Sequence, residues 1–149
     1  MTVPTAIYHL VPASSGAHGD IESQLHAILR PLAQQAGLKM IGQSNVGESE
    51  HDFRVPDGAL HRSPPNGVWH PTAALVIEIV SPGDESVEKL PFYAAHDVDE
   101  VLIVDPQERS VSWLVLEGGE YRPVERSGLV DLRARALAEQ LDWPRIDEG

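Results

Sequence analysis

The sequence contains no cysteine, and this absence excludes several classes of protein. A disulfide framework, a zinc site held by thiolates, a thiol nucleophile and a c-type haem attachment site all require cysteine. The chain also has no run of about 18 apolar residues, which a membrane-spanning helix needs. Its first fifteen residues lack the basic start and long apolar stretch of a signal peptide. We therefore expect a cytoplasmic protein with no membrane association.

Positive charge is scarce. The chain has 11 Lys and Arg residues against 23 Asp and Glu residues, which gives a formal net charge of −12. Because contacts from Lys and Arg to phosphate dominate affinity for nucleic acid, this balance disfavours unassisted binding to nucleic acid or to an anionic membrane. Arg54, Arg62 and Lys39 are candidates for a local basic patch. Such side chains are usually solvated, so we assign no DNA-binding surface from them.

Several catalytic motifs are also absent. The sequence has neither of the glycine-rich phosphate loops, which argues against nucleotide-dependent chemistry, and Gly118-Gly119 suits a hairpin turn instead. Ser81 follows an apolar run but lies in no G-x-S-x-G elbow, so a Ser/His/Asp hydrolase is excluded. The histidines match no HExxH motif. A metal site built on His51, His61 or His70, most simply through His51, stays a minor alternative because loop histidines usually lie at the surface.

The length and composition are those of a folded domain. A chain of 149 residues is typical of one domain, here 1–149. Apolar residues recur at helical spacing from Asp20 to Ala36, with Asp20 as the expected N-cap and Gly37 as the expected stop. Pro31 lies inside this segment and removes one backbone hydrogen bond, so we expect a kink or an early end there.

The most apolar run, Ala73–Val80, predicts a central strand. A second strand is predicted at Glu100–Val104, followed by Asp105 as the cap of a turn. Two further strands, Ser110–Glu117 and Tyr121–Val124, form a predicted hairpin. The other expected elements are extended segments at Leu38–Ile41 and Asp52–Leu60, a turn at Gln43–Gly47, a loop at His61–Pro71, a helix at Glu85–Ala95 capped by Asp84 and disturbed by Pro91, and a closing helix at Leu129–Leu141. This order predicts an α/β fold.

Glu78 needs a chemical explanation, because a carboxylate within an apolar strand costs several kcal/mol to bury unless it is paired. A salt bridge, a raised pKa or a metal ion could each compensate for that burial. Asp57 lies upstream and Lys89 downstream of the strand. Two carboxylates can hold Mg²⁺ or Mn²⁺ against a scissile phosphate, and a lysine can orient or deprotonate water. A structural ion pair or a solvent-facing position for Glu78 remains an equal alternative at this point.

These residues together resemble the Uma-two family, also called domain-of-unknown-function family 820, which is similar to PD-(D/E)xK restriction-type nucleases. The resemblance covers about Asp52 to Tyr121 and rests on Phe53–Asp57, Leu75–Pro82, Lys89 with Tyr93, and Asp99–Pro106. It implies a restriction-endonuclease-like mixed sheet flanked by helices, with DNA as a partner. It also implies Asp57 and Glu78 as metal ligands, the backbone carbonyl of Ile79 completing the inner shell, and Glu22 of the first helix as an added carboxylate.

The chain departs from this family pattern in two places. The usual lysine stands two residues after the glutamate, but position 80 is valine, so the resemblance assigns the lysine role to Lys89 on the following helix. The chain also begins close to its first helix, and a missing strand at the sheet edge would be supplied by a partner, which predicts a homodimer. Tyr93 falls on the same helical face as Lys89 and could pack over the site or form a hydrogen bond near it, with core packing as its expected use.

Three functions therefore compete. The leading hypothesis is a Mg- or Mn-dependent endonuclease with Asp57, Glu78 and Lys89 as catalytic residues. The main rival is a non-catalytic, dimeric binding or regulatory module on the same fold, which the negative net charge of −12 favours. The third is a structural scaffold that binds no metal.

Overall fold

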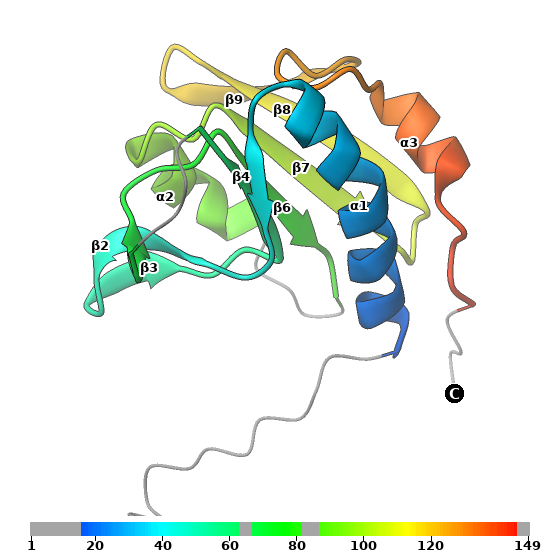
Figure 1. The fold of residues 1–149 in the computed structure, drawn as a ribbon, viewed down its shortest axis with the longest axis horizontal. Helices are drawn as coiled ribbons and strands as arrows, with labels where there is room; N and C mark the ends of the chain where they lie inside the picture. Colours follow the sequence, from blue (N-terminus) through cyan, green and yellow to red (C-terminus); the bar gives the residue numbers. More distant parts are fainter. Residues whose placement is uncertain (1–15, 63–66, 82–86, 146–149) are drawn as a thin grey trace, which may run out of the picture.

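The computed structural model describes residues 16–62, 67–81 and 87–145, and these form two sheets and three α-helices (Figure 1). The helices are α1 (Gly16–Gln35), α2 (Leu90–Ala95) and α3 (Ala134–Gln140), with a 3-10 turn at Val87–Lys89 just before α2. The strands are β1 (Lys39–Ile41), β2 (Asn45–Ser49), β3 (Asp52–Arg54), β4 (Gly58–His61), β5 (Trp69–His70), β6 (Leu75–Ile79), β7 (Glu100–Asp105), β8 (Ser110–Glu117) and β9 (Glu120–Val124).

The larger sheet has six strands in the order β1-β4-β6-β7-β8-β9. Its two central strands, β6 and β7, pair in parallel, whereas every other neighbouring pair in this sheet is antiparallel. A smaller sheet has the order β3-β2-β5. The mixed α/β class predicted from the sequence is confirmed, as are the central strand within Ala73–Val80 and the hairpin at Gly118-Gly119.

The two faces of the larger sheet have separate cores. On one face α1 and α3 pack against Leu75, Ile77 and Ile79 of β6. On the other face α2 supplies Tyr93, which packs with Val76. Side chains alternate along a strand, so Glu78 shares the face of Val76 and points toward α2. The apolar run in the sequence is therefore buried on both sides, with one carboxylate beneath α2.

Helix α1 is anchored by Ile21, Leu25, Leu29 and Ala33, which recur every four residues and are all buried. It begins at Gly16, so the predicted N-cap at Asp20 is wrong. The side chain of Asp20 is exposed within the first turns and accepts a hydrogen bond from Gln24. Three of the four residues missed at the start are glycine or alanine, and the four show no apolar periodicity.

Pro31 does not end α1 early, because the helix continues to Gln35. Pro31 is exposed, so its ring is accommodated on the solvent side, and the packing of Leu29 and Ala33 holds the turn around it. The predicted stop is confirmed, since Gly37 takes a φ of +76°, the left-handed conformation that commonly ends a helix.

The predicted turn at Gln43–Gly47 is wrong, because β2 already begins at Asn45. Gly47 looked like a turn residue but lies at a bulge within β2, where the register with β3 shifts. Its φ is +148°, and a Cβ there would lie 2.4 Å from the carbonyl oxygen of Asp52, so only glycine fits. The predicted loop at His61–Pro71 likewise contains β5, which pairs in parallel with β2.

The two later helices are shorter than predicted. Helix α2 begins only at Leu90, and Pro91 lies in its first turn, where the missing N–H is not needed. The expected cap Asp84 lies outside the described residues. Helix α3 begins at Ala134 because the preceding segment instead forms a loop held by the Ser127 hydroxyl, which accepts hydrogen bonds from the N–H groups of two later residues. Among the described residues, no helix has both the length and the apolar character to cross a membrane.

Candidate functional site

The end of β6 carries the candidate site, and Asp57 is fixed to it by two hydrogen bonds. The Asp57 backbone N–H donates to the carbonyl of Ile77 at 2.8 Å, which extends the β4–β6 ladder by one residue. The Asp57 carboxylate accepts a hydrogen bond from the backbone N–H of Ile79 through Oδ2, also at 2.8 Å. Continuing the β4–β6 register places Asp57 opposite Glu78 on the neighbouring strand.

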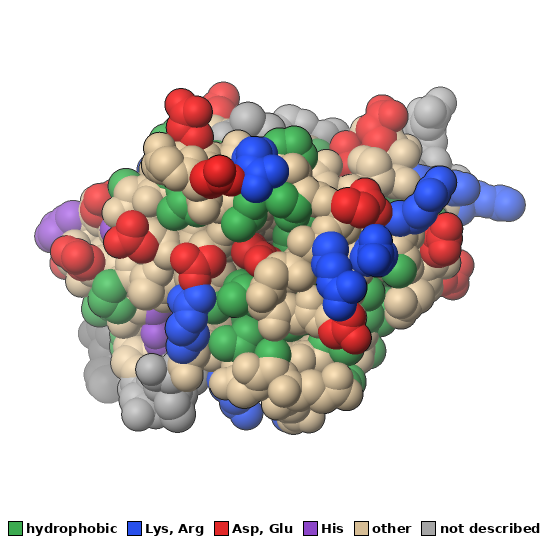
Figure 2. Space-filling view, turned by 90° about the horizontal axis from the view of Figure 1, so that it is seen from above, with side chains coloured by type: hydrophobic (Ala, Val, Ile, Leu, Met, Phe, Trp, Pro, Cys, Tyr) green, Lys and Arg blue, Asp and Glu red, His purple; other side chains and the backbone are tan. Residues whose placement is uncertain are grey.

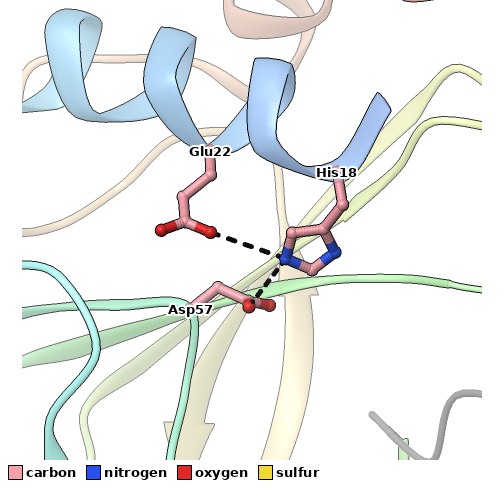
Figure 3. A group of neighbouring side chains, drawn as sticks. All are labelled: His18, Glu22 and Asp57. Atoms are coloured by element: carbon pink, nitrogen blue, oxygen red, sulfur yellow. Dashed lines mark hydrogen bonds and ion pairs between the residues drawn. The ribbon is translucent and has the colours of Figure 1, made fainter. Parts of the chain in front are cut away.

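The second oxygen of Asp57 faces helix α1. Its Oδ1 lies 2.9 Å from Nε2 of His18, and the same nitrogen lies 3.6 Å from Oε2 of Glu22 (Figure 3). His18 and Glu22 are four residues apart, so they project from the same side of α1. One ligand atom from each of these three residues lies within 4.8 Å of the other two. An imidazole nitrogen and two carboxylates are thus gathered where α1 begins.

These three side chains are shielded from water to different extents. The side chains of His18 and Asp57 are 12% and 14% exposed, whereas that of Glu22 is 36% exposed. The other ring nitrogen of His18, Nδ1, lies 3.3 Å from the hydroxyl oxygen of Ser81. His18 is therefore oriented by contacts at both ring nitrogens.

Glu78 belongs to a second set of contacts, on the face covered by α2. It is 1% exposed and accepts a hydrogen bond of 2.5 Å from the Tyr93 hydroxyl. The Lys89 ammonium lies 3.3 Å and 3.4 Å from its two oxygens. Burial raises the pKa of Glu78 to about 7, although the hydrogen bond from Tyr93 and the charge of Lys89 act against this rise. The negative charge of Asp57 on the neighbouring strand also raises this pKa.

The same burial keeps Tyr93 neutral. The pKa of Tyr93 is raised far above its ordinary value by burial and then by the charge of Glu78. Its hydroxyl therefore keeps its proton near neutral pH and can donate it to the ionised Glu78 carboxylate. Tyr93 has a polar function in addition to the core packing that the sequence predicted, since it is also fully buried among the residues under α2.

Comparison with known protein families decides the family of this chain. The family model Uma2, described as "Putative restriction endonuclease", matches residues 5–144. The chain belongs to the Uma2 family. A search of curated proteins gave no match.

Two solved structures are similar to this chain to different extents. One is described as "a putative nuclease belonging to DUF820 from Anabaena variabilis ATCC 29413" and is 16% identical, with a TM-score of 0.68 over 86% of this chain and 83% of that chain. Another is a cryoEM structure of a DrdV–DNA complex, which is 19% identical, with a TM-score of 0.49 over 84% of this chain and 11% of that chain. The first likeness confirms a restriction-endonuclease-like fold of the Uma2 type.

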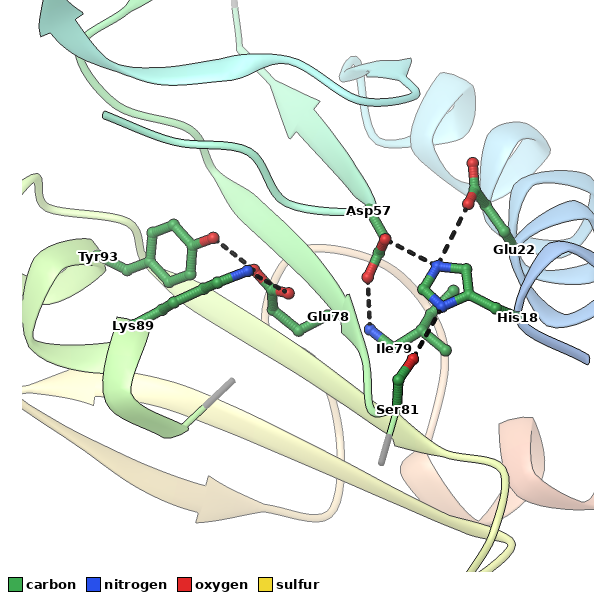
Figure 4. A network of polar contacts seen from close by, with 8 residues as sticks. All are labelled: His18, Glu22, Asp57, Glu78, Ile79, Ser81, Lys89 and Tyr93. Carbon is green, nitrogen blue, oxygen red and sulfur yellow. Dashed lines mark hydrogen bonds and ion pairs between the residues drawn. The ribbon is translucent and has the colours of Figure 1, made fainter. Parts of the chain in front are cut away.

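The residues predicted from the sequence fall into two groups in this Uma2 chain. Asp57 and Glu22 meet on the side of α1, whereas Glu78 and Lys89 meet on the side of α2 (Figure 4). Figure 4 shows the Asp57 carboxylate directed toward His18 and the Glu78 carboxylate directed toward Lys89 and Tyr93. Ile79 contributes its N–H to Asp57, and the metal-binding role expected for its carbonyl remains a prediction.

The sequence analysis did not single out His18. A lone histidine among small residues at a helix start has no local signal, and only the fold brings it to Asp57. The histidines weighed instead lie elsewhere: the side chain of His51 is 85% exposed beside Glu50, and the rings of His61 and His70 contact each other at 4.8 Å. Within the described ranges, none of these three joins a group of potential metal ligands.

Two of the three cationic candidates already have partners within the fold. The Arg54 guanidinium lies 4.5 Å from the ring centre of Phe92, and Arg62 is paired with Asp99. Lys39 is exposed on β1, at the edge of the larger sheet. On the face shown in Figure 2, basic and acidic side chains are interspersed among hydrophobic ones, without a continuous basic area. The Uma2 fold of this chain therefore carries no broad electrostatic footprint for nucleic acid on that face.

The donor set at Asp57 fits a divalent cation. Carboxylate oxygens are ligands for Mg²⁺ and Mn²⁺, and imidazole nitrogen is a common ligand for transition metals. The three donors come from two segments that are each held in place, one by the packing of α1 and one by the β4–β6 ladder. The site of this Uma2 chain therefore combines a group of potential metal ligands at Asp57 with a buried carboxylate that contacts a lysine.

Proposed function

We propose that this protein is a divalent-metal-dependent nuclease that hydrolyses phosphodiester bonds, with DNA as the expected substrate. The observation that carries the proposal is the position of Asp57 and Glu78 opposite each other on neighbouring strands at one end of β6, with Lys89 in contact with Glu78. Membership of a family described as restriction endonucleases supports the same reaction.

Asp57 and Glu78 would hold Mg²⁺ or Mn²⁺, with Glu22 and the carbonyl of Ile79 as further ligands. A bound ion supplies positive charge that offsets the charge developing on the phosphate, and it lowers the pKa of its water. Asp57 is prepared for this role because the N–H of Ile79 fixes one of its oxygens. Glu78 is held in place by Tyr93 and Lys89, which also act against the rise of its pKa to about 7 on burial.

Lys89 is placed to act on water or on phosphate. Its side chain is 27% exposed, and its ammonium contacts a carboxylate that is 2% exposed, so it lies between the interior and solvent. An ammonium there can orient an attacking water molecule or contact a phosphate oxygen as a point charge. The family pattern has a lysine two residues after the glutamate, whereas this chain has valine at position 80. The position of Lys89 beside Glu78 fits this departure.

The decisive experiment is a cleavage assay with labelled single- and double-stranded DNA and RNA, with Mg²⁺, Mn²⁺ or EDTA. We expect metal-dependent cleavage that is lost in D57N, E78Q and K89M. Matched controls are D52N, whose side chain is 70% exposed, E88Q beside Lys89, and K39M, which changes the other lysine of the chain. Cleavage that persists in D57N at wild-type rate would contradict the proposal.

One observation favours a second candidate, a non-catalytic binding module. The net charge of −12 opposes binding of a polyanion, and such a module would keep the acidic site without cleaving. It predicts a metal-dependent rise in melting temperature, lost in D57A, with no cleavage of any substrate. Dimerisation, expected for either candidate, stays a prediction that sedimentation equilibrium measures directly.

A further inference from the structure

We propose that His18 is a nitrogen ligand of the metal at Asp57, so that the site selects a first-row transition-metal ion such as Mn²⁺ over Mg²⁺. This inference rests on the proposed function only in sharing its metal site. It adds a residue that the sequence pattern does not contain, and it names the chemical class of the ion. The argument depends on three observations: the spacing of the donor atoms, the fixed orientation of His18, and the mixed chemistry of the donors.

The spacing of the donor atoms matches that around one ion. Two donors bonded to the same ion at about 2.1 Å and at right angles lie about 3 Å apart, and a wider angle brings this to about 3.5 Å. Nε2 of His18 lies 2.9 Å from Asp57 Oδ1 and 3.6 Å from Glu22 Oε2. All three donor atoms lie within 4.8 Å of one another. An ion therefore needs little rearrangement of these side chains to bind all three.

The orientation of His18 is also that of a ligand. Metal-bound histidines usually use one ring nitrogen for the ion and the other for a hydrogen bond that fixes the ring. Here Nε2 faces the two carboxylates, and Nδ1 lies 3.3 Å from the Ser81 hydroxyl oxygen. The backbone is fixed as well, because Ile21, on the next turn of α1, is fully buried. Figure 4 shows His18 placed between Ser81 on one side and Asp57 and Glu22 on the other.

The mixture of donors sets the metal preference. Mg²⁺ is a hard cation that prefers oxygen ligands and retains several water molecules. Imidazole binds Mn²⁺ weakly and the later first-row ions more strongly, whereas it contributes little to Mg²⁺. A site of two carboxylates and one imidazole should therefore bind transition metals more tightly than Mg²⁺. A site of Asp57 and Glu78 without His18 would lack this preference.

The first measurement is pulsed electron paramagnetic resonance of Mn²⁺ bound to the full chain, which detects a coordinated ¹⁴N nucleus without any assay of activity. We expect a ¹⁴N coupling in the wild type and in H26Q, and its loss in H18Q. His26 is the matched control because it lies on the same helix two turns after His18 and is not among the residues whose ligand atoms gather at Asp57. A wild-type spectrum of bound Mn²⁺ with no ¹⁴N coupling overturns the inference, whether or not the variants fold.

The second measurement is the affinity for Mn²⁺, Co²⁺ and Mg²⁺ by titration calorimetry. We expect H18Q to weaken Mn²⁺ and Co²⁺ binding by at least about tenfold and Mg²⁺ binding by much less. An equal loss of affinity for all three ions, or no loss of affinity for any of them, overturns the inference. A histidine with a merely structural role does not change the preference among ions. H18N replaces H18Q if the latter does not fold.

These outcomes separate the inference from the proposed nuclease activity. Cleavage that needs Asp57 but not His18, with no ¹⁴N coupling, leaves the nuclease in place and removes the histidine ligand. A ¹⁴N coupling that disappears in H18Q, with no cleavage of any nucleic acid, keeps the histidine ligand and removes the nuclease. Absence of Mn²⁺ binding to the wild type overturns the inference outright.

Discussion

The Tyr93 hydroxyl donates a hydrogen bond of 2.5 Å to Oε1 of Glu78, and both side chains are almost completely buried. Glu78 is thus a carboxylate whose pKa burial raises to about 7 while a neutral tyrosine and a lysine stabilise its ionised form. Its protonation state near neutral pH depends on these two partners, both of which belong to the segment Val87–Ala95.

Replacing Tyr93 with phenylalanine should raise the pKa of Glu78 further, because the hydrogen bond that favours the ionised carboxylate is lost. The free energy of unfolding above pH 7 should fall by about 1 to 3 kcal/mol, the usual cost of a buried polar group left unpaired. A ¹³C NMR titration of the glutamate carboxyl groups in metal-free protein measures the pKa. The control is Y121F, whose hydroxyl bonds instead to the carbonyl of Val98. An unchanged pKa in Y93F would contradict the assignment of Tyr93 as a donor.

His61 should make the protein less stable at acidic pH. It is 5% exposed, and burial together with the charge of His70 lowers its pKa from 6.5 to about 4. The unfolded chain therefore binds a proton at His61 more readily than the folded chain does, so stability is lost as pH falls from about 6.5 to 4. The whole loss is on the order of 3 kcal/mol at about 1.4 kcal/mol per pKa unit.

The effect of His61 is isolated by comparison of variants. Urea unfolding between pH 4 and 8 gives the free energy of unfolding of the wild type and of H61Q. The difference between the two should change between pH 4 and 6.5 and be constant above pH 7. H51Q is the matched control, since the side chain of His51 is 85% exposed. A difference between wild type and H61Q that is the same at pH 4 and pH 7 would rule out the lowered pKa.

Glu100 should be important for stability although it lies outside the candidate site. It is 2% exposed and accepts hydrogen bonds from Trp113 Nε1, the Ser127 hydroxyl and the N–H of Gly128. In E100Q an amide group replaces one acceptor oxygen and faces a hydrogen-bond donor. We therefore expect the free energy of unfolding to fall by about 1 to 3 kcal/mol. Chemical unfolding followed by tryptophan fluorescence measures it. E117Q, at the exposed end of β8, should change stability by less than about 0.5 kcal/mol, and an equally small effect of E100Q would count against this reading.

Pro31 should make α1 less stable than its sequence otherwise allows. A proline within a helix removes one hydrogen bond and crowds the carbonyl four residues earlier, which costs about 3 kcal/mol relative to alanine. Pro31 is exposed, so P31A removes this cost without disturbing the core. We expect a higher melting temperature and about 1 to 3 kcal/mol of added stability, measured by circular dichroism. Q34A on the same exposed side is the control, and a destabilised P31A would show that the ring makes favourable contacts.

The sequence predicts those parts of the structure whose signals are local. The run Ala73–Val80 is apolar enough to be a central strand, and Gly118-Gly119 marks a hairpin. The strand at Asn45–Ser49 is missed because its parallel pairing with Trp69–His70 depends on a segment far along the chain. The residues around Gly47, which are typical of a turn, form a bulge within that strand.

The same distinction applies to the candidate site. Glu78 is conspicuous because a carboxylate interrupts an apolar strand, and Lys89 follows from the search for a compensating charge. His18 has no such signal, since its neighbours in the sequence are small or polar and its partners lie 39 and 63 residues away. Only the packing of α1 against β6 brings the imidazole to Asp57. A histidine ligand at this position is therefore a property of the tertiary structure.

The alternation along β6 explains how the lysine of the family pattern can change its place in the sequence. Side chains two residues apart on a strand point to the same face of the sheet, so a lysine at position 80 would lie on the face that Glu78 occupies. Lys89 reaches that face from above, through the turn that opens α2. An amine can therefore reach Glu78 either from the strand itself or from the turn that covers it, because both lie on the same side of the sheet. A search that requires a fixed spacing between the glutamate and the lysine misses a chain in which the lysine lies in that covering turn.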